Sequence, residues 1–160
     1  MVDTTKQTKG AGTQLLSLKE GSTFNPDAPT YTESDWELYS QVEELQPGEI
    51  TVAEEQEDYL DDAEGDWNSY QPGAKDAGTT TATLVWKPGD AVQQKINADI
   101  AADTKKWWLI KYPNGLGDIT YGFISSAGKT VSRKDKIKRT IKIRNSGKPV
   151  LDDSLNVPVA

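Results

Sequence analysis

Short runs of alternating apolar and polar residues divide the chain into segments typical of β-strands. The clearest run is 79–86, where Thr80, Ala82, Leu84 and Trp86 share one face and three threonines and a valine share the other. Runs of this kind predict seven strands, at 13–18, 36–45, 50–56, 79–86, 107–112, 118–125 and 137–144.

One segment has helical spacing instead. Val92, Ile96 and Ile100 recur every four residues and form an apolar stripe on a helix of about 12 residues. Asp90 stands before this stripe as a candidate N-cap, and Gln93 three residues later completes a capping-box pattern.

The turn Pro47-Gly48 joins 36–45 to 50–56 and predicts a hairpin, with the glutamate-rich second strand at an exposed edge. The remaining segments are polar or rich in Gly and Pro, and we expect an N-terminal arm at 1–12, a long acidic loop at 59–78 and a C-terminal arm at 147–160. Together these features predict a single domain over 1–160. Its fold class is mainly β: an antiparallel β-sandwich or barrel with one α-helix packed on its side and extended loop and terminal arms.

Composition excludes several classes of function. The 160 residues include no Cys and no His, which removes disulfides, thiolate or histidine metal ligands and imidazole general bases. The longest apolar run, 107–110, is far shorter than the roughly 20 residues of a membrane helix. The N-terminus also lacks the apolar stretch of a secretory signal. We therefore expect a soluble protein made in a cytoplasm, without cofactor, catalytic residue or membrane partner.

Charge is distributed unevenly along the chain. The net charge is −7, yet residues 20–66 contain 16 acids and no base, whereas residues 129–148 contain nine bases and one acid. The acidic total argues against tight DNA binding, and the basic segment lacks the interleaved aromatics that stack on bases. Opposite charges on the two segments fit either a monomer with two solvated faces or copies that pair with one another.

Two motifs suggest ligand binding but depart from the patterns that such binding needs. The stretch 122–130 resembles a phosphate-binding loop, with five residues between its glycines where the motif requires four. A calcium loop beginning at Asp62, Glu64 and Asp66 would place Trp67 at the obligatory glycine and Gly73 at the obligatory glutamate. Paired carboxylates and tryptophans also leave glycoside hydrolysis or carbohydrate binding open.

Several motifs together resemble one family. They are KGAGT (9–13), PGEI (47–50), EDYLDDAEGDW (57–67), VWKPG (85–89), YPNG (112–115), ISSAGKTVSRK (124–134) and KRTIKIRNSGKP (138–149). In this order and spacing they are similar to the N-terminal domain of the major tail tube protein of phage lambda and its long-tailed relatives. The resemblance covers about residues 9–149, and we expect no counterpart of the immunoglobulin-like C-terminal domain of the lambda protein.

The resemblance implies a structural virion protein that forms six-membered rings, which stack into the tube through which the genome leaves the capsid. Its partners would be other copies of itself, the tape measure protein, and the tail-tip or baseplate and tail terminator proteins. DNA would slide through an acidic or neutral lumen without specific binding, and synthesis would take place in the host cytoplasm. Opposite charges along the chain agree with head-to-tail contacts, which close into rings or repeat as filaments.

Three groups of residues are candidates for assembly. A ring-stacking loop, expected to be mobile in the monomer and ordered by the next ring, holds Tyr59, Leu60, Asp61, Asp62, Asp66 and Trp67. An intersubunit basic strand, expected to lie against acids of a neighbour, holds Lys138, Lys142 and Arg144. Candidate lumen acids are Glu37, Glu43, Glu54 and Glu57.

Two alternatives stay open. A ring-forming tube protein of a type VI-like secretion or contractile system would share the fold and the ring. A carbohydrate-binding β-sandwich would be monomeric and would respond to sugars.

Overall fold

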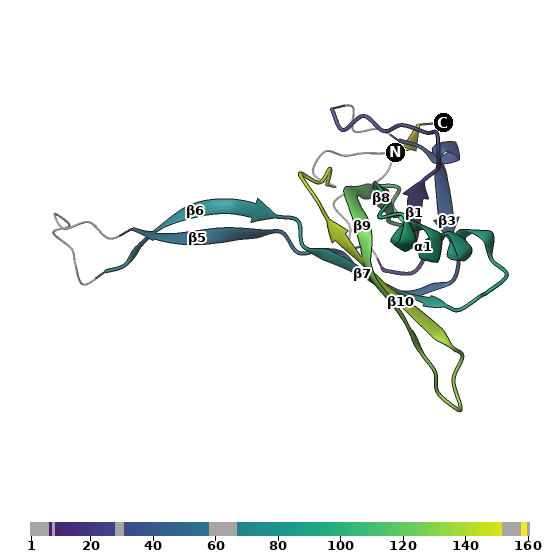
Figure 1. Ribbon diagram of the computed structural model, residues 1–160. Coiled ribbons are helices and arrows are strands. Elements are labelled where there is room, and N and C mark those ends of the chain that lie inside the picture. The colour runs from purple at the N-terminus through teal and green to yellow at the C-terminus, as the bar shows by residue number, and fades with distance from the viewer. Residues whose placement is uncertain (1–6, 8, 28–30, 58–66, 152–157, 160) are drawn as a thin grey trace.

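The computed structural model describes residues 7, 9–27, 31–57, 67–151 and 158–159. Its strands are β1 (Gln14–Leu18), β2 (Tyr31–Thr32), β3 (Trp36–Tyr39), β4 (Val42–Gln46), β5 (Thr51–Glu57), β6 (Ser69–Asp76), β7 (Thr79–Val85), β8 (Lys105–Lys111), β9 (Gly117–Thr130), β10 (Lys138–Asn145) and β11 (Pro158–Val159). Its helices are the 3-10 helix η1 (Glu33–Asp35) and α1 (Ala91–Ala101). The predicted class, mainly antiparallel β with one α-helix, is confirmed (Figure 1).

One seven-stranded antiparallel sheet forms the body, in the order β3-β1-β8-β9-β10-β7-β4. Its two end strands, β3 and β4, are separated by only Ser40 and Gln41, so the sheet must curl until its ends approach each other. Gln41 makes the corner with a φ of 55°, and its carbonyl accepts a hydrogen bond of 3.2 Å from the Val85 amide of β7. The segment 36–45, expected to be one strand, is therefore two strands at opposite ends of the sheet.

The curled sheet encloses the main core. Alternate residues of β7 and β10 point inward, including Leu84, Ile141 and Ile143, and all three are fully buried. Trp108 of β8 and Ile96 of α1 pack into the same cluster. The alternation predicted for 79–86 is thus confirmed for Thr80, Ala82 and Leu84.

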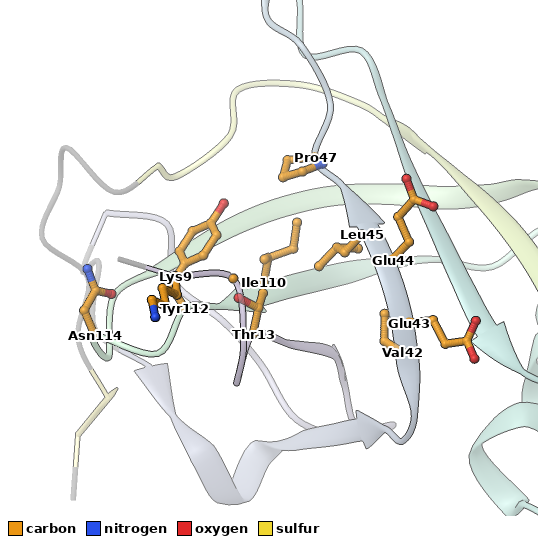
Figure 2. A pocket seen from close by; sticks show the side chains of 11 residues that line it. Lys9, Thr13, Val42, Glu43, Glu44, Leu45, Pro47, Ile110, Tyr112 and Asn114 are labelled. Atoms are coloured by element: carbon orange, nitrogen blue, oxygen red, sulfur yellow. The ribbon is translucent and has the colours of Figure 1, made fainter. Parts of the chain in front are cut away.

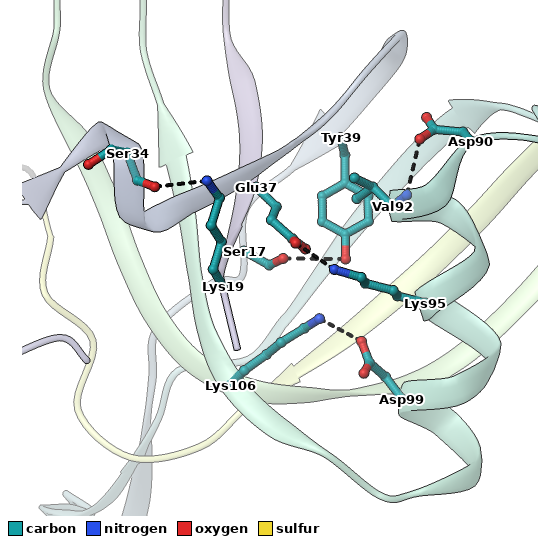
Figure 3. A network of polar contacts seen from close by, with 10 residues as sticks. All are labelled: Ser17, Lys19, Ser34, Glu37, Tyr39, Asp90, Val92, Lys95, Asp99 and Lys106. Carbon is teal, nitrogen blue, oxygen red and sulfur yellow. Dashed lines mark hydrogen bonds and ion pairs between the residues drawn. The ribbon is translucent and has the colours of Figure 1, made fainter. Parts of the chain in front are cut away.

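Polar contacts fix α1 on the body (Figure 3). The predicted N-cap is confirmed, because the Asp90 carboxylate accepts a hydrogen bond of 3.1 Å from the Val92 amide. Gln93 does not complete a capping box. Its buried amide donates to the Val85 carbonyl at 2.9 Å and accepts from the Lys87 amide at 3.1 Å, which ties the helix to the end of β7. Ile100, at the end of the predicted stripe, is exposed.

Two ion pairs and a buried tyrosine add to this network (Figure 3). Lys95 of α1 pairs with Glu37 of β3 at 2.5 Å, and Asp99 of α1 pairs with Lys106 of β8 at 2.5 Å. Between these elements lies the Tyr39 side chain, whose burial raises the pKa of its hydroxyl to about 12. The helix is therefore held against β3 and β8 on one side of the core.

A second, aromatic cluster covers the opposite face of β1, β8 and β9. Phe24 packs edge-on against Trp36 and Trp107, with ring centroids 6.0 and 4.9 Å apart. Val150 completes the cluster by pairing with Ile119 of β9 through backbone hydrogen bonds of 2.7 and 2.8 Å. The central strands are consequently buried on both faces.

Two further sequence predictions are wrong. The strands at 36–45 and 50–56 do not form a hairpin with each other, because β3 pairs with β1, β4 with β7, and β5 with β6. The expected loop 59–78 contains strand β6 over residues 69–76, despite Pro72 and Gly73. Each strand of a two-stranded sheet has one edge that faces solvent. A proline is tolerated where its missing N–H would point to that edge, because no hydrogen bond between strands is lost.

Candidate assembly interface

Two hairpins project from the body in different directions (Figure 1). One consists of β5 and β6, which form a separate two-stranded sheet. The other consists of the distal half of β9, which extends past β8, together with β10 and the connection between them. We call them the acidic hairpin (51–57 with 69–76) and the basic hairpin (124–144).

The acidic hairpin exposes large apolar side chains. Trp67 is 76% exposed and Tyr70 56% exposed, and Ile50 and Val52 are also well exposed. An isolated two-stranded hairpin is only marginally stable in water, since neither face buries enough apolar surface. Exposed aromatic residues on such a hairpin are typical of a surface that another molecule covers.

The root of the acidic hairpin is held by close backbone packing. A Cβ atom added at Gly48 would lie 2.5 Å from the Ala77 carbonyl oxygen and 2.5 Å from the Asn145 side-chain nitrogen. That Asn145 amide donates to the Ala77 carbonyl and to the Thr80 hydroxyl, both at 3.2 Å. Only glycine fits at position 48, so the chain leaves the main sheet here in one defined direction.

An ion pair closes the same root. Arg144 of β10 pairs with Asp76 at the end of β6. The Gly78 amide and then Arg144 hold the pKa of Asp76 below its usual value. Because this pKa is lowered on folding, the contribution of the carboxylate is present above its unfolded pKa and is lost as the pH falls through the folded value.

The outer face of β4, β7, β10 and β9 is polar. Strand register aligns Glu44 with Thr83, Thr83 with Thr140, and Thr81 with Lys142, so these side chains lie on the same side of the sheet, opposite the core. We call this surface the threonine face: Glu44, Gln46, Thr79, Thr81, Thr83, Ser126, Lys138, Thr140, Lys142 and Arg144.

Charges on and beside the threonine face balance within the chain. Lys138 pairs with Glu43 at 3.0 Å, and the hydrogen bond to this carboxylate raises the pKa of the lysine. Arg144 pairs with Asp76 beside the same surface. Two of the three bases on the threonine face, Lys138 and Arg144, therefore have carboxylate partners within the chain, whereas Lys142 lies between Thr81 and Ser126.

A groove of about 590 Å³ opens between β4 and the end of β8 (Figure 2). Val42 and Leu45 point into it from β4 and face Ile110, while the carboxylates of Glu43 and Glu44 point away. The groove marks the place where the curled sheet does not close completely. Among the described residues, no cluster of three or more acids is arranged to hold a metal ion. Within the same part of the chain, no helix is long and apolar enough to cross a membrane.

A family model for the lambda phage tail tube protein matches residues 20–152. This match spans most of the chain. The chain belongs to the lambda phage tail tube protein family. It is therefore a structural component of a phage tail and not an enzyme, and the resemblance in its motifs is confirmed. Comparison with curated protein sequences gives no match.

Solved structures with low sequence identity share the fold of this tail tube protein. The tail of an empty GTA particle, refined with C6 symmetry, has a TM-score of 0.67 at 10% identity over 91% of this chain and 98% of that chain. The SPP1 tail tube has a TM-score of 0.59 at 18% identity over 90% and 78%. A chain from the anti-feeding prophage (AFP) baseplate has a TM-score of 0.62 at 8% identity over 94% and 98%. At such identities the likeness establishes the fold.

The candidate residues are spread over different parts of the tail tube protein. Of the lumen acids, Glu37 pairs with α1 and Glu43 pairs with Lys138. On the acidic hairpin, Glu54 is exposed and Glu57 is half-buried. Of the basic strand, Lys138 and Arg144 have partners within the chain, while Lys142 is exposed. Trp67 is exposed beside β6. The other ring-stacking candidates lie outside the described residues: Tyr59, Leu60, Asp61, Asp62 and Asp66. The calcium candidates Asp62, Glu64 and Asp66 lie outside them as well.

Sequence reasoning missed the root of the acidic hairpin. The sequence marks Gly48 only as part of a turn and Asn145 only as the end of a strand. The one signal for this root is Asn145 itself. It continues the inward-facing positions of β10 after Arg139, Ile141 and Ile143, and it is polar yet buried. A buried amide at such a position needs hydrogen-bond partners, and the Asn145 side-chain nitrogen finds two at the hairpin root.

We predict that Gly48→Ala destabilises the unassembled protein by about 1–3 kcal/mol, because the new methyl group collides with the Ala77 carbonyl. Amide exchange in β5 and β6 should also become faster. Gly89→Ala is the matched control, since nothing lies within 4 Å of its added Cβ atom. Urea unfolding and hydrogen exchange measure both effects, and equal behaviour of the two variants would contradict the role of Gly48.

Proposed function

We propose that this protein forms six-membered rings through head-to-tail contacts and that the rings stack into the tail tube, through which the genome passes. Membership of the tail tube family supports assembly into a tube. The GTA tail, which has the same fold and C6 symmetry, supports six copies per ring. Two projecting hairpins of opposite charge suit heterologous contacts, which close into rings in one direction and repeat along an axis in another. Synthesis in the host cytoplasm belongs to the same proposal.

A tube has an interior and two ends, and we expect further protein partners at each of these places. The tape measure protein would occupy the lumen before the genome passes. Tail-tip or baseplate proteins would present the first ring, and a terminator would cover the last. Matching folds occur in an AFP baseplate structure and in a PVC sheath/tube terminator structure, which supports a shared way of docking at tube ends.

Electron microscopy of concentrated protein tests the proposal directly. We expect tubes of uniform diameter, with six-fold symmetry in end-on class averages. Protein that stays monomeric at every concentration and salt tested, or rings with another symmetry, would contradict it. A type VI-like system would give similar rings, and a gene neighbourhood rich in secretion genes rather than tail genes would favour that alternative.

The threonine face is the surface we assign to the lumen wall. DNA carries about one negative charge per 1.7 Å of axis and adheres to unpaired Lys or Arg. Here Lys138 and Arg144 are paired with carboxylates, Lys142 is the one base of this face without an ion pair among the described residues, and the remaining rows are largely threonine. Such a wall is close to neutral, as the expectation of an acidic or neutral lumen requires. In this arrangement Glu43 and Glu44 would neutralise bases on the lumen wall.

Adding positive charge to this face should slow genome ejection. In particles carrying Thr81→Lys with Thr83→Lys, we expect tubes of normal appearance and slower ejection, most clearly at low ionic strength where screening is weakest. Thr23→Lys with Asn25→Lys, in an exposed loop, makes the same charge change elsewhere and serves as the control. Equal ejection rates for the two variants would remove the threonine face from the lumen.

Trp67 is the residue we assign to contact between stacked rings. Because its side chain is 76% exposed, Trp67→Ala should change the free energy of unfolding by no more than about 0.5 kcal/mol. The same substitution should raise the protein concentration needed for tubes, whereas Trp67→Phe should restore part of the loss. Tubes that form from Trp67→Ala at the wild-type concentration would exclude this role.

A further inference from the structure

The two projecting hairpins have opposite charge. Between Thr51 and Asp76 the sequence contains nine acids and one lysine, and between Ser125 and Arg144 it contains eight bases and one acid. Opposite charge on two exposed surfaces of the same chain is the pattern expected when copies of that chain bind one another.

Several of these charged residues form no ion pair within the described part of the chain. Among the residues that the structure describes, the acidic-hairpin residues Glu54, Glu55 and Glu57 form no ion pair. The same holds for Arg133, Lys134 and Lys136 in the connection between β9 and β10, all of which are exposed. By contrast, the root residues Arg144 and Asp76 already satisfy each other.

Both hairpins also offer strand edges. Pairing between β8 and β9 ends at Phe123, so the distal half of β9 has β10 as its one strand neighbour in the described part of the chain. Strands β5 and β6 pair with each other in a sheet of two. Pro72 lacks an N–H on β6, which leaves β5 as the edge better able to accept another strand.

Apolar groups lie among these charges on each side. Val131 is 71% exposed at the end of the basic hairpin, and Tyr70 is 56% exposed on the acidic hairpin. An apolar centre surrounded by complementary charges is the usual composition of a specific protein contact. Because the two hairpins diverge from the body, they do not meet within one copy (Figure 1).

We propose that the acidic hairpin of one copy docks on the distal basic hairpin of an adjacent copy, through Glu54 and Glu55 on one side and Lys134 and Lys136 on the other. This inference rests on the proposed tube, and it names the surface that receives the acidic hairpin. The contact is heterologous, so every copy gives one hairpin and receives another, and the chain of contacts continues without a symmetric end. Nucleic acid is the other class of partner that a basic hairpin could bind, but the complementary surface is present on every copy.

Reciprocal charge reversal tests the contact. One variant carries Glu54→Lys with Glu55→Lys, so that lysines replace the two acids proposed for the contact. The other carries Lys134→Glu with Lys136→Glu, so that glutamates replace the two bases proposed for the contact. Each variant alone should need about tenfold or more protein than wild type to form tubes, because like charges then face each other.

An equimolar mixture of the two variants should form tubes again, with both chains in equal amounts, because alternating copies restore every contact. A single chain carrying all four substitutions should also form tubes. Glu20→Lys with Asp27→Lys, exposed acids on the body, matches the charge change of the first variant and should assemble like wild type. Wild-type tubes should weaken as salt is raised.

The outcomes separate this inference from the proposed function. If wild-type protein forms tubes but the mixture does not, the hairpins do not contact each other and the tube proposal stands. Normal tubes from either variant alone lead to the same conclusion, and a base-reversed variant that assembles normally but releases DNA at lower salt would assign the basic hairpin to nucleic acid. If wild-type protein forms no tubes, both proposals fall.

Discussion

Backbone N–H and C=O groups at the edge of a β-sheet need hydrogen-bond partners. In this fold the corner at Ser40 and Gln41 determines where the two edge strands, β3 and β4, find them. The corner carries one chain segment from β3, at one end of the sheet, to β4, at the other. The sheet then has to curl around its apolar side chains, and β4 lies beside β7 instead of extending β3. Because β4 ends next to β7, Gly48 lies against Ala77 and Asn145, and the acidic hairpin leaves the body from that point. The direction of the projecting surface therefore depends on a corner at the opposite side of the core.

The sequence predicts those strands that are buried on one face, because burial imposes alternation. Leu84 in β7 and Ile141 in β10 belong to such strands, and both lie on the predicted face. The acidic hairpin has no buried face, so its residues alternate only weakly, and Pro72 makes β6 resemble a loop. At Gln41 the positive φ occurs without the glycine that usually signals it, so the break in 36–45 could not be predicted.

The candidate site was predictable as a distribution of charge but not as a set of contacts. Composition separates an acidic from a basic segment, and the structure brings both to projecting surfaces. Which charges are neutralised within the chain depends on strand register. Glu43 occupies the irregular position between β4 and β7 and reaches Lys138, whereas Glu54 on β5 reaches no base among the described residues. Register is set by the whole sheet. A lysine that resembles an interface residue in the sequence can thus belong to an ion pair of its own chain.

Marginal stability of the projecting hairpins is useful in a polymer. A two-stranded hairpin gains little from folding alone, so much of the free energy of ordering its surface is recovered only on contact with another copy. A single contact of this kind between two copies would therefore be weak. In a ring each incoming copy engages several neighbours at once, and the second contact forms at the high effective concentration that the first one creates. Growth on an existing ring is then favoured over association of free copies, because only the ring offers several complementary hairpins in fixed positions. The rigid root at Gly48 and Asn145 contributes to this difference, since it presents the acidic hairpin in one direction and reduces the entropy lost when the hairpin binds.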